Sequence, residues 1–109
     1  IDFLTEQKRL NKSVIAYGAA AKGNTLLNYA GISTDLLPLV VDAAASKQGK
    51  YLPGSHIPIL APDQISLKKP DFVLILPWNI AEEVMQQQSH IREWGGQFVT
   101  VIPELQVSS

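Results

Sequence analysis

The residues best suited to chemistry run from Gly18 to Thr25, directly after the apolar run Val14–Tyr17. A buried strand that leads through a glycine and alanine turn into a helix presents backbone N–H groups and the positive end of the helix dipole, which together bind anions such as phosphate. Gly18 and Gly23 occupy the first and third glycine positions of G-x-G-x-x-G, and Ala20 replaces the second. This spacing predicts a phosphate or nucleotide neighbour.

The polar side chains of this segment fit that role. Lys22 would supply a point charge and Thr25 a hydroxyl donor, with Ala19 and Asn24 beside them. The alternative is that small residues let the helix pack closely on the sheet, which would explain Gly18 and Gly23 but not the neighbouring polar residues. Lys22 precedes its glycine, so the segment does not match a P-loop.

Two further strand ends carry candidate binding residues. Asp42 ends the second apolar run, where an acidic residue of a dinucleotide fold accepts hydrogen bonds from a ribose diol; a polar strand end or turn cap explains it equally well. Pro77, Trp78 and Asn79 follow the run Phe72–Leu76. Trp78 could stack on a base or sugar ring, whereas Asn79 either contacts a ligand or caps the next helix.

Few residues of the sequence match a known catalytic or metal-binding motif. His56 lies in a loop and is the one candidate catalytic residue, although a structural hydrogen-bonding role is the more common explanation for such a histidine; His90 lies on the polar side of the last predicted helix. No Ser-His-Asp or paired-carboxylate spacing stands out, and the chain has no cysteine. We expect no metal site here and no catalysis by this chain alone.

Composition narrows the class of protein. The chain has 109 residues, enough for one domain, and its 46% hydrophobic and 17% charged content is typical of a globular protein. A net charge of −1 without a basic stripe disfavours nucleic-acid binding.

No apolar run reaches the roughly 20 residues of a membrane helix and no signal peptide opens the chain, so we expect a cytoplasmic protein. The chain begins at Ile1, within a predicted helix, and we interpret residues 1–109 as one domain cut from a longer polypeptide.

The elements that would position these residues alternate between strands and helices. Four continuous apolar runs are typical of parallel strands covered on both faces: Val14–Tyr17, Leu39–Val41, Phe72–Leu76 and Phe98–Ile102. Predicted helices lie at Asp2–Leu10, Gly23–Ala30, Asp63–Leu67 and Asn79–Trp94, the last capped by Asn79 with Glu82 in a capping box. After the irregular segment Asp42–Pro58, the residues Ile57–Leu60 are predicted to form a short edge strand. The order predicts an α/β, Rossmann-like doubly wound sheet, mostly parallel, with four to five strands and flanking helices.

The motif around Gly18 resembles the C-terminal domain of S-adenosylmethionine-dependent sugar C-methyltransferases. Four segments in order carry the resemblance and span nearly the whole chain: Tyr17–Tyr29, Lys47–Ile59, Leu74–Asn79 and Ile91–Gly96. The resemblance implies a parent enzyme with an N-terminal zinc-binding region, then a domain that binds S-adenosylmethionine, then a Rossmann-like domain. It places zinc and S-adenosylmethionine upstream of Ile1 and no cofactor within this chain.

The resemblance also implies a substrate and a role. Such enzymes methylate a carbon next to the ketone of a nucleotide-linked deoxysugar, and the C-terminal domain helps to hold that nucleotide-sugar against the methyltransferase domain, its partner in the same polypeptide. The substrate-binding residues that we assign accordingly are Gly18, Ala19, Ala20, Lys22, Gly23, Asn24, Thr25, Asp42, Lys47, Pro77, Trp78 and Asn79. The chain departs from the family at Ala43–Ser46, where relatives carry a polar stretch containing Asn-Pro.

A second hypothesis comes from a different class. The same fold could be the NAD(P)-type dinucleotide-binding domain of an oxidoreductase, with Asp42 on the ribose. Ala20 in the middle glycine position and the lack of a recognisable catalytic group argue against this hypothesis.

Overall fold

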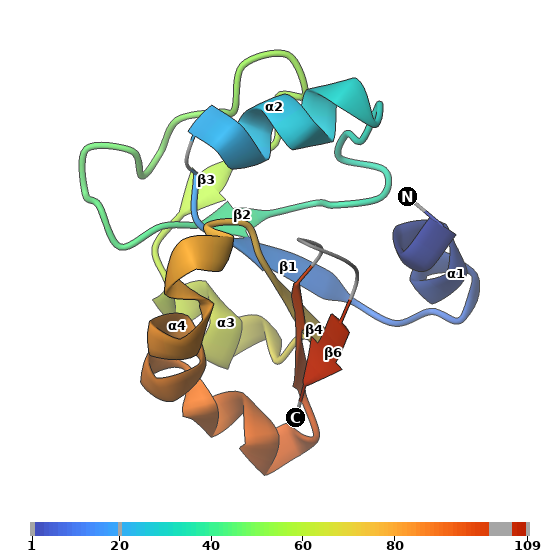
Figure 1. Cartoon of the computed structure of the whole chain (residues 1–109), viewed down its shortest axis with the longest axis vertical. Helices are drawn as coiled ribbons and strands as arrows, with labels where there is room; N and C mark the ends of the chain where they lie inside the picture. The colour runs from blue at the N-terminus through green and yellow to red at the C-terminus, as the bar shows by residue number, and fades with distance from the viewer. Residues whose placement is uncertain (1, 20, 101–105, 109) are drawn as a thin grey trace.

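Six strands form one sheet in the order β3-β2-β1-β4-β5-β6 (Figure 1). The computed structural model describes residues 2–19, 21–100 and 106–108. The strands are β1 (Val14–Tyr17), β2 (Val40–Val41), β3 (Ile59–Leu60), β4 (Phe72–Ile75), β5 (Gln97–Thr100) and β6 (Gln106–Ser108). The first five are parallel, and β6 pairs antiparallel with β5.

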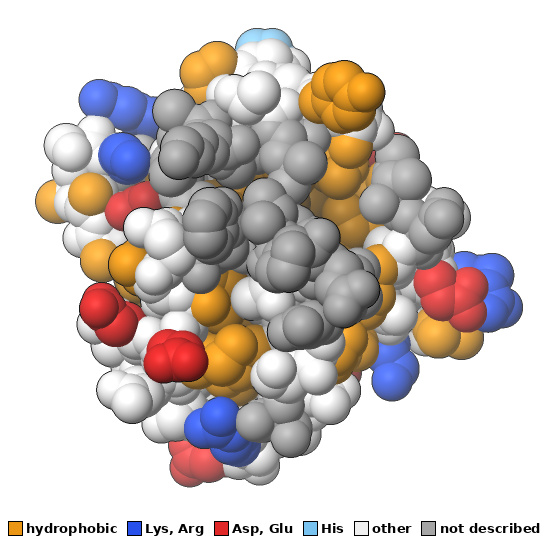
Figure 2. All heavy atoms as spheres, viewed as in Figure 1, with side chains coloured by type: hydrophobic (Ala, Val, Ile, Leu, Met, Phe, Trp, Pro, Cys, Tyr) orange, Lys and Arg blue, Asp and Glu red, His pale blue; other side chains and the backbone are white. Residues whose placement is uncertain are grey.

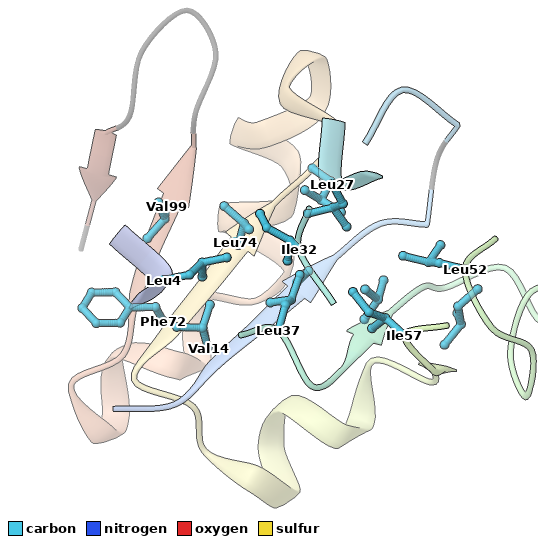
Figure 3. Packing of buried hydrophobic residues seen from close by; sticks show 14 residues of the cluster. Leu4, Val14, Leu27, Ile32, Leu37, Leu52, Ile57, Phe72, Leu74 and Val99 are labelled. Atoms are coloured by element: carbon cyan, nitrogen blue, oxygen red, sulfur yellow. The ribbon is translucent and has the colours of Figure 1, made fainter. Parts of the chain in front are cut away.

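Both faces of the sheet are buried, because every residue of β1 and β4 is covered although neighbouring side chains point to opposite faces. One face packs on α1 (Asp2–Arg9) and α2 (Ala21–Tyr29), through Leu4 and Leu27 (Figure 3). The other packs on α3 (Asp63–Lys68), α4 (Ala81–Gln87) and a 3-10 helix η2 (Ser89–Trp94), through Ile65, Val84 and Ile91. This confirms the predicted Rossmann-like α/β fold; the sixth strand was not predicted.

Helix α2 begins at Ala21, two residues earlier than predicted. Its first turn therefore consists of Ala21, Lys22 and Gly23, so the unpaired N–H groups of the helix start shift from Gly23–Thr25 toward Ala21. The helix ends at Tyr29, one residue before the predicted end, and Gly31, whose φ is +72°, lets the Ile32 N–H reach the Leu27 carbonyl at 2.9 Å.

The prediction of one helix over Asn79–Trp94 was wrong. The chain forms a 3-10 turn η1 (Trp78–Ile80), then α4, then η2, and no side-chain cap precedes α4. The reason for the first break is that Ile80 N–H bonds the Pro77 carbonyl at 3.0 Å, so the chain winds tightly before α4 begins. The second break lets η2 bury Ile91 and lets the Trp94 indole donate to the Pro70 carbonyl at 2.9 Å.

The segment between β2 and β3 covers the edge of the sheet. Gly49 N–H bonds the Ile59 carbonyl and Ile59 N–H bonds the Lys50 carbonyl, each at 2.8 Å, so residues 49–51 run antiparallel beside β3. This pairing protects an edge strand that would otherwise expose its backbone groups. The predicted edge position of Ile57–Leu60 is confirmed for β3, and the last predicted strand lies at 97–100 with residues 101 and 102 outside the described residues.

Candidate functional site

The carboxyl ends of β1 and β4 form the point at which the strand order reverses. The chain leaves β1 for α2, β2 and β3 on one side, and returns through α3 to β4 on the other. At such a point the loops diverge and leave a crevice, where open α/β sheets bind their ligands. Three segments reach this edge: residues 18–19, 42–48 and 76–79.

Gly18 is fixed by a close approach between two of these segments. Its N–H bonds the Val41 carbonyl at 2.7 Å, and Leu76 N–H bonds the Tyr17 carbonyl at 3.0 Å. Its φ is +96°, and a Cβ there would overlap the Pro77 ring, lying 2.8 Å from Cγ and closer to Cδ. The glycine is therefore required by Pro77 and by its backbone conformation, not by packing of α2, which was the alternative considered from the sequence.

Asp42 ties two of the segments together. Its Oδ2 accepts from the Ala19 N–H and its Oδ1 from the Ala44 N–H, each at 2.8 Å. Each carboxylate oxygen thus already has one backbone donor, and a ribose diol would have to use the remaining lone pairs. Burial, and secondarily the charge of Asp42, raise the pKa of the Tyr17 phenol above its ordinary value of 10.0, so this hydroxyl keeps its proton at neutral pH.

Both the backbone N–H and the backbone carbonyl of Ala19 are hydrogen-bonded. The N–H is held by Asp42, and the carbonyl accepts from the Lys47 ammonium at 3.3 Å. Because Gly18 and Ala19 N–H groups are both bonded, an anion at this edge would meet the N–H groups of the first turn of α2. The structure thereby brings the predicted residues Gly18, Ala19, Asp42, Lys47 and Pro77 together.

Those of the remaining predicted residues that the structure describes lie on the flanking helices. The backbones of Lys22 and Gly23 lie in the first turn of α2, that of Trp78 lies in η1, and Ala20 lies outside the described residues. Asn24 has a buried Oδ1 without a hydrogen-bond partner among the described residues, whereas Thr25 and Asn79 are exposed.

Neither histidine lies with the predicted residues at this edge. His56 has a φ of +59° in the turn after the 49–51 segment, and its N–H bonds the Leu52 carbonyl; the neighbouring Pro53 carbonyl accepts from Asn28, near the end of α2. This turn lies beside the later part of α2 rather than at its start. His90 packs edge-on against Trp94 and lies 3.1 Å from Ser66 Oγ, on the far face of the sheet. His90, which was predicted on the polar side of the helix, is partly buried.

One contact at this edge had no sequence signal. The Gln48 side-chain amide donates to the Asp42 main-chain carbonyl at 2.8 Å. A single glutamine in an irregular segment carries no spacing or composition cue, and only the folded turn reveals this contact.

The described residues hold no group of three or more His, Cys, Asp and Glu side chains that could bind a metal ion. Among them, no helix is both long and apolar enough to cross a membrane. On the face in Figure 2, the visible Lys and Arg side chains lie near Asp and Glu side chains, mostly around the margin of the view. The charge distribution on that face offers no single-sign patch among these residues.

Residues 1–103 match the family model of the C-methyltransferase C-terminal domain. The chain belongs to this family. A curated relative, the C-methyltransferase NovU of Streptomyces niveus, is 42% identical over 98 residues, which cover 90% of this chain and 23% of that protein. The chain therefore spans about a quarter of the length of the relative that it matches.

A solved structure supports the fold independently. The UDP-D-quinovosamine 4-dehydrogenase of Vibrio fischeri superposes with a TM-score of 0.62, covering 90% of this chain and 93% of the matched chain. Sequence identity is 19%, so this likeness shows the Rossmann-type fold alone.

Proposed function

We propose that this chain is the nucleotide-sugar-binding domain of a longer S-adenosylmethionine-dependent C-methyltransferase. The observation that carries the proposal is the meeting of Gly18, Asp42, Lys47 and Pro77 at the strand-reversal edge, in a chain whose family is the C-methyltransferase C-terminal domain. The first turn of α2 would bind the diphosphate, with Lys22 and Lys47 as cations. Trp78 and Asn79 would border the base or the sugar.

The proposed reaction takes place beside this domain rather than within it. A base of the full protein would remove the proton next to the sugar ketone, and the resulting enolate carbon would accept the methyl group. S-adenosylmethionine would supply that methyl group from another domain, and zinc would bind elsewhere in the polypeptide. The role of the described residues is to hold the nucleotide-sugar in place, which lowers the entropy cost of bringing carbon and methyl group together.

Ala20 in the middle glycine position favours this proposal over an NAD-binding domain, and half of the acceptor capacity of Asp42 is already in use. In a dinucleotide site the corresponding carboxylate is the ribose acceptor, whereas here it already accepts from Ala19 and Ala44. We therefore give the carboxylate a structural role in the site.

Calorimetric titration of the full-length protein with thymidine diphosphate–glucose and uridine diphosphate–glucose tests the proposal. We expect at least one of these probes to bind, and we expect Lys22→Ala with Thr25→Ala to weaken that binding about tenfold or more, as loss of a charge-assisted phosphate contact does. The control is Lys8→Ala with Thr34→Ala, two exposed residues outside the predicted binding segments. Binding that is equally strong in both double variants would contradict the assigned contacts.

A further inference from the structure

The turn that carries Lys47 is closed by the side chain of the next residue, Gln48. Residues 42–48 return on themselves through Lys47 N–H to the Ala44 carbonyl at 3.0 Å and Gln48 N–H to the Ala45 carbonyl at 3.2 Å. The Gln48 side chain completes the turn by donating from Nε2 to the Asp42 carbonyl at 2.8 Å. Its half-buried amide therefore connects the end of the turn to the end of β2.

The Gln48 contact bears on the candidate site through two residues. Asp42, whose carbonyl it holds, uses its carboxylate to bind the Ala19 N–H. Lys47, which precedes Gln48, places its ammonium 3.3 Å from the Ala19 carbonyl. An ammonium has three N–H donors and this contact uses one, so two donors remain for a ligand while the turn keeps Lys47 beside Ala19.

We propose that Gln48 is a positioning residue that holds the 42–48 turn so that Lys47 faces the nucleotide-sugar. This inference rests on the proposed function and adds a residue that neither its spacing nor its chemistry singled out. Gln48 does not touch the ligand. Without its side-chain donor the turn would populate open conformations, and the apparent affinity would fall in proportion to the closed fraction.

Two variants remove the donor in different ways. Gln48→Glu replaces the amide N–H by a carboxylate oxygen facing the Asp42 carbonyl, and Gln48→Met keeps the length of the side chain without charge or donor. Gln86→Glu, on the exposed side of α4, is the matched control for the added charge. The Met variant keeps the test valid if the Glu variant fails to fold.

The experiment measures the affinity of the full-length protein for a sugar-nucleotide and for S-adenosylmethionine, together with amide hydrogen exchange. We expect both Gln48 variants to weaken whichever of thymidine diphosphate–glucose and uridine diphosphate–glucose binds the wild type, about tenfold, as for loss of an ordinary hydrogen bond. The dissociation constant for S-adenosylmethionine should remain within twofold of the wild type. In the absence of ligand, amide hydrogen exchange in residues 43–50 should be faster in both Gln48 variants than in the wild type. Gln86→Glu should change neither of the two affinities nor the exchange rate.

The possible failures are distinguishable. Unchanged exchange in residues 43–50 would overturn the holding role of Gln48, and faster exchange with unchanged sugar-nucleotide affinity would overturn its role in positioning Lys47. Equal weakening of both ligands would assign Gln48 to general stability instead. A wild type that binds neither sugar-nucleotide would overturn the proposed function, and the positioning role with it, before any variant is compared.

Discussion

Gly18 carries two constraints at one residue. Its positive φ excludes most side chains, and the Pro77 ring occupies the space that a Cβ would need. Gly31 has a positive φ of +72° with nothing within 4 Å of its Cβ position, so it isolates the first constraint from the second.

Replacing Gly18 by alanine should cost more stability than the same change at Gly31. We expect Gly18→Ala to lower the free energy of unfolding by about 2–4 kcal/mol, combining backbone strain with overpacking against Pro77. Gly31→Ala should cost about 1 kcal/mol from backbone strain alone. Urea denaturation of the two variants measures both values, and equal losses would show that Pro77 accommodates the methyl group.

At this scale the sequence predicted residue positions better than residue roles. The glycine-alanine turn, Asp42 and Pro77 were predicted to lie at a binding edge, and the structure brings them together. Their backbone contacts were not predictable, because they depend on how closely two strand ends approach. Gln48 had no periodicity or motif to mark it.

Among the elements, the junction between β1, α2 and β2 depends on one carboxylate. Asp42 accepts N–H groups from Ala19 and Ala44, and so connects the turn after β1 to the turn after β2. Asp63 is also an aspartate, but it is exposed in the first turn of α3.

An Asp42→Asn variant should weaken this junction. The new side-chain NH₂ group cannot accept a backbone N–H, so one amide loses its acceptor, at a cost of about 1–3 kcal/mol in the free energy of unfolding. Asp63→Asn should cost less than about 1 kcal/mol, from the helix dipole alone. Chemical denaturation compares the two, and an Asp42→Asn protein as stable as Asp63→Asn would contradict the role of the carboxylate.

The elements themselves followed from apolar runs where burial is complete. β1 and β4 are buried on both faces, and their sequences are continuous and apolar. The segment after Pro77 was harder, because propensity and caps favour one helix over Asn79–Trp94 while the tertiary contacts of Ile91 and Trp94 select the tighter winding of η2. β6 has three residues with an exposed Val107, so no apolar run marks it.

At the level of the whole molecule, the strand order of the sheet determines where the candidate site lies. The order β3-β2-β1-β4-β5-β6 puts the strand reversal between β1 and β4, so segments that are up to about 60 residues apart in the sequence meet at one edge. The alternation of strands and helices predicted this class of fold, whereas the distances among Gly18, Asp42, Lys47 and Pro77 required the structure.

Hydrogen exchange of the full-length protein can show whether a nucleotide-sugar binds at this edge of the sheet. In the presence of saturating thymidine diphosphate–glucose or uridine diphosphate–glucose, we predict slower amide exchange in residues 17–25, 42–49 and 76–80. Residues 10–13 and 34–38, at the opposite edge where the strands begin, should exchange as in the free protein. Protection confined to the opposite edge, or no protection in any of the three segments while the ligand is bound, would show that the nucleotide-sugar does not bind at this edge.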